Sequence, residues 1–259
     1  MSKALFFDID GTLVSFKTHT IPLSACNAIK QLKANGHKVF IATGRSKLLI
    51  NNLGDLDFDG FVSMNGAHCY TSDHQDIYKG TIPTEDIERL VSYCSTHDYP
   101  FLCVSDKDWF ITHSNEAVQQ ICQLIKIKTP PFAPIETALE REVLEMMGYF
   151  PKETDEEVFS GVLTHCDTVR WHPVFTDIVK KGINKSTGID EVIRFFGFNL
   201  EDTIAFGDGG NDIPMLKHAG IGIAMGNASE KVQASADYIT TSVDEDGIAN
   251  ALKHLRLIE

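Results

Sequence analysis

Two aspartates separated by one residue, Asp8 and Asp10, stand near the start of the chain, in the segment Asp8-Ile9-Asp10-Gly11-Thr12. The apolar run Ala4–Phe7 comes directly before them and is typical of a strand buried on both faces of a parallel sheet. Because side chains alternate along an extended chain, both carboxylates point to the same side. They repel by about 4 kcal/mol at an effective dielectric constant of about 20, so they require a cation or a shared proton. We therefore predict an acidic pocket with a chemical role.

Two further polar clusters come directly after apolar runs. Thr43 and Gly44 follow one such run, and the segment Gly207–Asp212, which carries three acidic or amide side chains, follows another. Parallel strands place their carboxyl ends at one edge of a sheet, where ligands bind, so we expect all three clusters to meet there. Helices expected after Thr43 and Asp212 would direct backbone N–H groups at that edge, an arrangement that favours an anion.

The predicted pocket combines several carboxylates with Lys185, the Thr43 hydroxyl and free backbone amides. Oxygen ligands without histidine or thiolate favour a hard cation, and Mg²⁺ is the natural one. Mg²⁺ and Lys185 together would offset the acids and leave room for a phosphoryl group, whose transfer depends mostly on positioning and charge stabilisation. An aspartate can attack phosphorus and form an acyl-phosphate, while a second carboxyl protonates the leaving alcohol and then activates water.

Four segments, taken jointly and in order, resemble the motifs of the haloacid dehalogenase-like (HAD) phosphatases. They are Asp8–Thr12, Ala42–Arg45, Ile183–Lys185 and Gly207–Asp212. The chain is more narrowly similar to the Cof-like subfamily, in which an α+β cap of the class IIB type is inserted between the second and third motifs. The resemblance implies an α/β fold with a Rossmann-like parallel-sheet core and an inserted α+β cap domain.

The resemblance also implies roles for individual residues. Asp8 would be the nucleophile and Asp10 the general acid/base. Four residues would hold the phosphate: Thr43, Gly44, Lys185 and Asn211. Mg²⁺ would be bound by Asp8, Asp208 and the backbone carbonyl of Asp10, with Asp212 in or beside the outer ligand sphere.

Three assignments stay open at this point. Arg45 either faces the substrate or forms a structural ion pair between core and cap. Ser186 stands where the family usually has glycine after its lysine, which leaves Lys181 as a competitor of the favoured Lys185. Asn65-Gly66 predicts a turn first, and a role in binding substrate is the less favoured alternative.

Apolar runs and turn signals divide the chain into a core domain, residues 1–80 and 181–259, and a cap domain, residues 81–180. In the core, a helix with Ser24 as N-cap ends at Gly36, and another helix is expected near Ser46. In the cap, helices at 85–96 and 115–127 alternate with strands, and a hairpin is expected over 168–179. Thr154 and Glu157 predict a capping box at the start of a further helix.

Composition restricts the class of partner. The chain has 259 residues and a formal charge of −13, which argues against nucleic acid and anionic membrane surfaces. No apolar stretch approaches the length of a membrane span, and no signal peptide is recognisable. Six scattered cysteines without a C-x-x-C pair indicate reduced thiols in a cytoplasmic protein, and His165, Cys166 and His172 fit no zinc-binding spacing.

We therefore predict a Mg²⁺-dependent phosphatase that hydrolyses small phosphomonoesters, with sugar phosphates favoured, through an aspartyl-phosphate. We expect it to act as a monomer or weak dimer. A phosphomutase or phosphotransferase on sugar phosphates is the alternative, because a sugar hydroxyl can replace water as acceptor. A receiver-type signalling domain is about half this length, and a non-catalytic sugar-phosphate sensor would have no use for Asp10.

Overall fold

The computed structural model describes residues 2–124 and 127–259, and the chain forms two compact units. The first unit combines Met1–Tyr78 with Asn184–Glu259, and the second consists of Lys79–Ile183. We call them the core unit and the inserted unit. Each is described by itself below.

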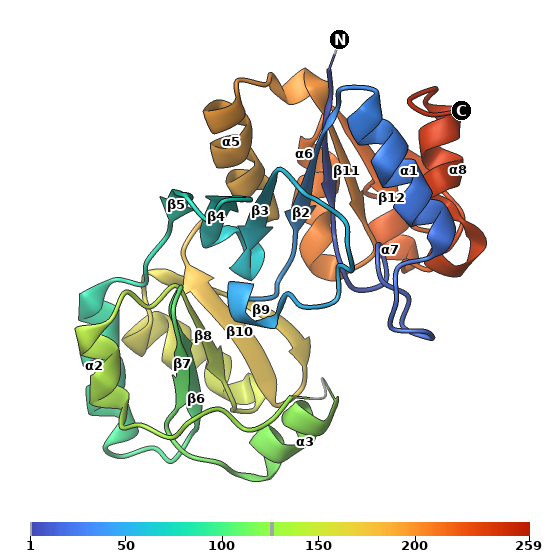
Figure 1. The fold of residues 1–259 in the computed structure, drawn as a ribbon. Helices are drawn as coiled ribbons and strands as arrows, with labels where there is room; N and C mark the ends of the chain where they lie inside the picture. The colour runs from blue at the N-terminus through green and yellow to red at the C-terminus, as the bar shows by residue number, and fades with distance from the viewer. Residues whose placement is uncertain (1, 125–126) are drawn as a thin grey trace. The chain divides into compact units, whose positions relative to one another are not determined.

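The core unit is built on an eight-stranded sheet with the strand order β13-β12-β11-β1-β2-β3-β4-β5 (Figure 1). The strands from β13 to β3 run parallel, and β4 runs antiparallel to β3. Their bounds are β1 Ala4–Phe7, β2 Lys38–Ala42, β3 Gly60–Ser63, β4 His68–Thr71, β5 Asp76–Lys79, β11 Thr203–Gly207, β12 Ile221–Ala224 and β13 Tyr238–Ile239. This sheet confirms the predicted α/β fold class.

Strand β1 lies between β11 and β2, and this pairing sets the level at which the functional loops begin. Phe7, the last residue of β1, is in register with Phe206 of β11 and Ile41 of β2. The residues that follow these strands therefore emerge together at the carboxyl edge, as expected for parallel strands.

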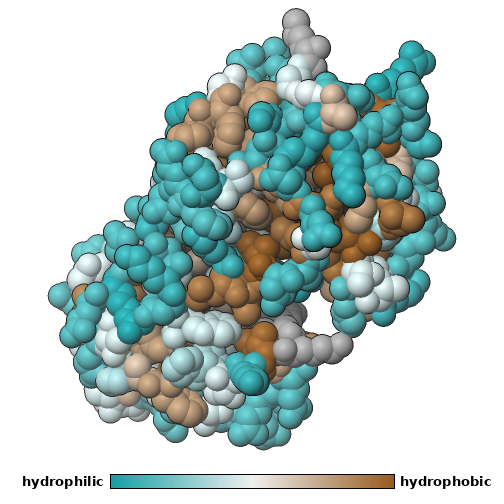
Figure 2. Space-filling view, in the orientation of Figure 1, coloured by the Kyte–Doolittle hydropathy of each residue, from teal (hydrophilic) through white to brown (hydrophobic). Residues whose placement is uncertain are grey.

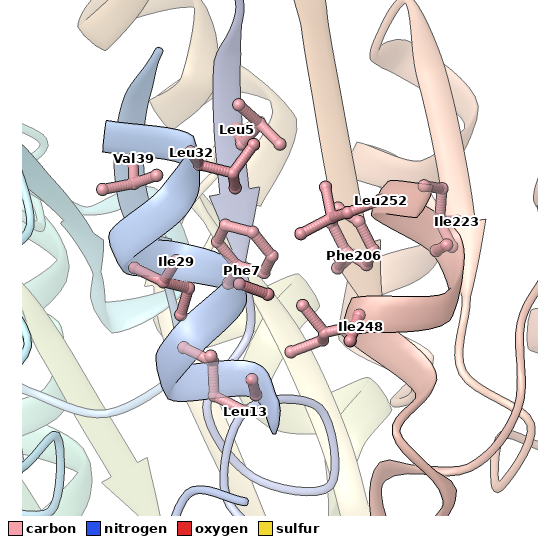
Figure 3. Close-up of a cluster of buried hydrophobic side chains, with 14 of the residues drawn as sticks. Leu5, Phe7, Leu13, Ile29, Leu32, Val39, Phe206, Ile223, Ile248 and Leu252 are labelled. Carbon is pink, nitrogen blue, oxygen red and sulfur yellow. The ribbon is translucent and has the colours of Figure 1, made fainter. Parts of the chain in front are cut away.

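Helices cover both faces of the core sheet. Side chains alternate along β1, so Leu5 and Phe7 face one layer while Ala4 and Phe6 face the other. On the first face, helices α1 (Leu23–Ala34) and α8 (Gly247–His254) pack their apolar side chains on the strands, as the labelled residues in Figure 3 show. On the second face, α5 (Lys185–Phe196) and α6 (Ile213–His218) do the same. The short helix α7 spans Glu230–Gln233.

The inserted unit has its own five-stranded sheet with the order β7-β6-β8-β10-β9. All of its described neighbours pair antiparallel, including the predicted hairpin of β9 and β10. The strands are β6 Phe101–Val104, β7 Trp109–Ile111, β8 Glu145–Gly148, β9 Cys166–His172 and β10 Phe175–Lys180, and the helices are α2 Thr84–Cys94, α3 Glu116–Leu124 and α4 Asp155–Glu157. Leu90 of α2 packs with Phe101, Met146 and Phe150 in a separate apolar core.

Three local predictions were wrong or incomplete. Helix α1 begins at Leu23 after Pro22, whose fixed φ of −56° sets the entry into the helix, and Ser24 makes no cap hydrogen bond among the described residues. Thr154 makes no described cap bond either, because it already has helical backbone angles at the end of a 3₁₀ turn, whereas an N-cap is normally extended. Near Ser46 the chain forms a single 3₁₀ turn, Lys47–Leu49, in place of the expected helix.

The predicted helix over 115–127 is present as α3, and its residues 125 and 126 lie outside the described part of the chain. Figure 2 shows hydrophilic residues over much of the visible face of each unit, and hydrophobic residues that also gather on the visible face of the core unit. Within residues 2–124 and 127–259, no helix combines the length and the apolar character that crossing a membrane requires.

Candidate active site

The loop after β1 carries the two predicted acids and turns sharply at Gly11. Gly11 has φ +86°, a conformation that favours glycine, and a Cβ built on it would lie 2.2 Å from Asp208 Oδ2. Asp8 is almost fully buried, and its Oδ1 accepts a hydrogen bond from Lys185 Nζ at 2.6 Å. The tight turn therefore brings the loops after β1 and β11 into direct contact.

Lys185 is the first residue of α5, and its fully buried ammonium lies between two carboxylates. Its Nζ is 2.6 Å from Asp8 Oδ1 and 2.5 Å from Asp212 Oδ1. The helix start is fixed by Asn184, whose side chain accepts the N–H groups of Ser186 and Thr187 in a capping box. Burial lowers the pKa of the Lys185 amine, but the charges of Asp212 and Asp8 outweigh it, so the pKa is raised above its ordinary value.

The competing lysine takes no part in this cluster. Lys181 is exposed and belongs to the inserted unit, whereas Lys185 belongs to the core unit. Of the two predicted alternatives, Lys185 is the one with described contacts to the acids.

The acids after β11 differ in how their oxygens are used. Asp212 Oδ2 accepts the backbone N–H groups of Asp208 at 2.9 Å and Gly209 at 2.8 Å, and its Oδ1 accepts from Lys185. Asp208 Oδ1 accepts from the Thr12 hydroxyl at 2.9 Å, and its Oδ2 from Asn227 Nδ2 at 3.2 Å. Asp212 therefore orients the loop and Lys185, while the Asp208 carboxylate lies beside the β1 loop.

The donor set of this cluster suits a hard divalent cation. Asp8, Asp208 and Asp212 each offer an oxygen, and these oxygens lie within 4.8 Å of one another. Among the described side chains of this cluster, Lys185 supplies one positive charge against these three carboxylates, so two negative charges are left without an offset when all three ionise. Two charges and all-oxygen ligands match Mg²⁺ in charge and in ligand preference.

Burial also perturbs the acids in the absence of a cation. It raises the pKa of Asp8 well above its ordinary value, even though the Lys185 charge opposes the shift. Burial likewise raises the pKa of Asp208 to about 6, despite the hydrogen bond from Thr12. Both shifts mean that ionisation at this site costs free energy which a bound cation would offset.

The predicted phosphate-holding residues meet at the same edge. The Asn65 N–H donates to the Thr43 carbonyl at 3.1 Å, which joins the turn after β3 to the loop after β2. Asn211 Nδ2 donates to Asn65 Oδ1 at 3.0 Å, and a Cβ on Gly44 would lie 3.5 Å from Asn211 Nδ2. Thr43, Gly44 and Asn211 therefore lie around one buried residue, Asn65.

Asn65 was predicted first as part of a turn, with a role in binding substrate as the less favoured alternative. Its φ of 52° is left-handed, as a tight turn after β3 requires, and asparagine tolerates this conformation better than most residues. Its Nδ2 is buried and has no hydrogen-bond partner among the described residues. The dipeptide Asn65-Gly66 signals the turn but not the direction of the side chain, so the contact with Asn211 could not be predicted from it.

Arg45 contacts the second acid of the pair. Its Nε and Nη2 donate to Asp10 Oδ2 at 2.6 Å and Oδ1 at 2.7 Å, and its Nη1 donates to the Leu49 carbonyl. These partners all belong to the core unit, so the described contacts are not the core–cap ion pair that was one of the two alternatives for Arg45. The substrate role of Arg45 stays a prediction.

A comparison with known families decides the classification. The family model for haloacid dehalogenase-like hydrolases matches residues 5–252. The chain belongs to this family. The HAD hydrolases are enzymes. The match to this family confirms the predicted resemblance to the Cof-like HAD phosphatases.

Two solved structures and one curated relative are similar to this HAD hydrolase along its whole length. The HAD subclass IIB sugar phosphatase BT4131 is 45% identical, covers 99% of this chain and 100% of its own, and has a TM-score of 0.89. BT1666, a HAD phosphatase from Bacteroides thetaiotaomicron, is 37% identical over 100% of this chain and 96% of its own, with a TM-score of 0.93. The Bacillus subtilis (strain 168) protein named "Putative phosphatase YkrA" is 34% identical over 100% of this chain and 99% of its own length.

Proposed function

We propose that this HAD hydrolase cleaves small phosphomonoesters through an aspartyl-phosphate on Asp8. The observation that carries the proposal is the setting of Asp8: a buried carboxylate, one oxygen held by Lys185, at the edge where Thr43, Gly44 and Asn211 meet. Among the described residues, Lys185 is the one side chain that donates to the Asp8 carboxylate, and it donates to Oδ1. The other oxygen, Oδ2, is therefore the one available to react with phosphorus.

The proposed reaction proceeds in two displacements. In the first, an Asp8 oxygen forms a bond to phosphorus, the bond from phosphorus to the ester oxygen breaks, and Asp10 gives a proton to the leaving alcohol. In the second, Asp10 takes a proton from water, the water oxygen bonds to phosphorus, and the Asp8–phosphorus bond breaks to release phosphate. Lys185, Thr43, the Gly44 amide and Asn211 orient the phosphoryl oxygens in both displacements.

The proposed cofactor is Mg²⁺, supported by the all-oxygen donor set and by the two charges that Lys185 leaves without an offset. Asp8, Asp208 and the Asp10 carbonyl would hold it, and a bound Mg²⁺ supplies positive charge to the phosphoryl oxygens. Sugar phosphates are the proposed substrate class, supported by the sugar phosphatase BT4131, which is similar from end to end. A cytoplasmic location also stays a proposal, supported by six free cysteines.

The deciding experiment replaces Asp8 by Asn and measures phosphate release from p-nitrophenyl phosphate and from a panel of sugar phosphates. We expect turnover to fall by about 10⁴-fold or more, because an amide cannot form the acyl-phosphate. Thermal unfolding checks that the variant folds, and Asp57→Asn, at an exposed side chain, is the matched control. Wild-type turnover by Asp8→Asn would refute the nucleophile. Transfer to an added sugar without phosphate release in its absence would favour a phosphotransferase.

A further inference from the structure

Asn227 lies in the loop after β12 and joins three loops of the core unit. Its Nδ2 donates to the Gly11 carbonyl at 2.9 Å and to Asp208 Oδ2 at 3.2 Å. Its Oδ1 accepts the Val243 N–H at 2.9 Å. One carboxamide therefore connects the loop after β1, the loop after β11 and the segment that precedes α8.

These contacts constrain the Asp208 carboxylate on both sides. Thr12 donates to Oδ1 and Asn227 to Oδ2, while Gly11 packs so closely that an added Cβ would lie 2.2 Å from Oδ2. Rotation of the carboxylate would break one donor contact or the other. Each Asp208 oxygen still has a second lone pair that can bind a cation. One of the two Asp208 oxygens lies within 4.8 Å of oxygens of Asp8 and Asp212.

We propose that Asn227 is a positioning residue that fixes the Asp208 carboxylate for a divalent cation and so sets the cation affinity of the site. The inference rests on the proposed function only in taking Asp208 as a ligand. Residues that hydrogen-bond a ligating group typically change metal affinity by roughly 10- to 100-fold when they are removed. Asn227 is itself exposed, so its replacement leaves no large cavity in the core.

A second connection between the same loops provides a control. It distinguishes the positioning of Asp208 from simple anchoring of the loops. Asp244, next to Val243, accepts a hydrogen bond from the Ser15 hydroxyl at 2.6 Å and pairs with Lys17 at 2.8 Å. It therefore joins the loop after β1 to the segment before α8, as Asn227 does, but has no described contact with Asp208. If Asn227 acts only as a loop anchor, Asp244→Asn should reproduce the effect of Asn227→Ala.

The experiment measures Mg²⁺ binding by calorimetry for the wild-type chain, Asn227→Ala and Asp244→Asn. We expect Asn227→Ala to weaken Mg²⁺ binding by roughly 10- to 100-fold and Asp244→Asn to leave it within about twofold. In turnover assays, the half-saturating Mg²⁺ concentration of Asn227→Ala should rise by the same factor, while kcat at saturating Mg²⁺ stays near the wild-type value. Should Asn227→Ala fail to fold, Asn227→Ser takes its place, since a hydroxyl is too short to reach both Gly11 and Asp208.

The Mg²⁺-binding measurements test the positioning role even if the chain shows no turnover. Unchanged Mg²⁺ affinity in Asn227→Ala, or equal weakening in Asp244→Asn, would overturn the positioning role. A wild-type chain that binds Mg²⁺ but releases no phosphate would refute the proposed function and leave the Asn227 comparison intact. A wild-type chain that binds no Mg²⁺ would overturn both.

Discussion

Lys185 shares its ammonium between two aspartates whose remaining oxygens are in different situations. Asp212 has both oxygens occupied, one by Lys185 and the other by two backbone N–H groups. Asp8 has one oxygen held at 2.6 Å and the other without a described donor. The two aspartates that contact the Lys185 ammonium therefore differ. Asp212 is held on both oxygens and orients the lysine, whereas Asp8 keeps the oxygen that the proposed nucleophile requires.

The raised pKa of Asp208 predicts how pH and Mg²⁺ act together on stability. The folded pKa is about 6, and the unfolded value is about 4. Because the folded pKa is the higher one, the stability that the protonated carboxyl contributes is present below about pH 4 and lost as the pH rises to about 6. A cation bound to the ionised carboxylate offsets this loss.

We therefore expect Mg²⁺ to raise the unfolding temperature more at about pH 7.5 than at about pH 5. The measurement is thermal unfolding of chelator-treated protein with and without Mg²⁺. Asp208→Asn, which removes this titrating carboxyl, should show a smaller dependence on pH in this difference. An equal rise at both pH values in the wild-type chain would contradict the expectation.

At the scale of elements, the position of Lys185 depends on how closely α5 approaches β3. Gly188 lies one turn after Lys185, and a Cβ on it would lie 2.4 Å from Val62 Cγ1 and 3.0 Å from the Gly66 Cα. The helix can pack this closely only because residue 188 lacks a side chain.

Gly188→Ala should therefore destabilise the protein by about 1–3 kcal/mol, although alanine is the better helix former by about 1 kcal/mol. Activity should fall as well, since a shifted α5 moves Lys185 away from Asp8. The matched control is Gly161→Ala in the turn Val158–Val162, where no atom lies within 4 Å of the added Cβ, and we expect neutral or slightly higher stability. Urea unfolding measures both, and equal effects of the two substitutions would contradict this account.

The sequence predicted the core sheet well because its strands are short, uninterrupted apolar runs, and buried parallel strands require such runs. Runs such as Ala4–Phe7 and Thr203–Phe206 also located the acids, since these lie at the strand ends. Asn65 was ranked only as a less favoured candidate, and Asn227 was not considered for the site, because each is a single polar residue in a turn. Their directions depend on tertiary contacts with Asn211 and Asp208 that leave no periodic trace. The predictions of Ser24 and Thr154 as helix caps were wrong for a similar reason, because a preceding proline or turn overrode the local pattern.

At the scale of the whole molecule, each unit has its own apolar core and its own buried ionic cluster. In the inserted unit, the fully buried Asp86 accepts hydrogen bonds from Arg89, from the His165 backbone and ring at 2.9 Å, and from the Cys166 thiol at 3.4 Å. Both Asp86 oxygens accept hydrogen bonds, and the Arg89 guanidinium lies beside them. The cluster therefore joins α2 to β9 and to the loop before β9.

Asp86→Ala should lower the stability of the inserted unit by about 2–3 kcal/mol, because it removes the charged acceptor of the hydrogen bonds from Arg89, His165 and the buried Cys166. The Mg²⁺ affinity of the cluster of Asp8, Asp208 and Asp212 should not change, since these three acids lie in the core unit. Asp86 belongs instead to a second group of possible cation ligands, with Glu85 and His165, in the inserted unit. Both tryptophans, Trp109 and Trp171, belong to the inserted unit, so their fluorescence during urea unfolding follows this unit. Asp98→Ala, at a fully exposed side chain, is the control. A loss of Mg²⁺ binding in Asp86→Ala would contradict the separation of the two clusters.

The central strand β1 pairs on one side with β2, which follows it closely in the chain, and on the other with β11, some two hundred residues further on. During synthesis, one edge of this apolar strand therefore waits without a partner until the ribosome has added the entire inserted unit and α5. A chain that stalls before β11 exposes that edge, which is a template for aggregation, and it also lacks the lysine or the second set of acids around Asp8. Asp8 therefore acquires its full set of neighbours only once the segment after β11 has been synthesised.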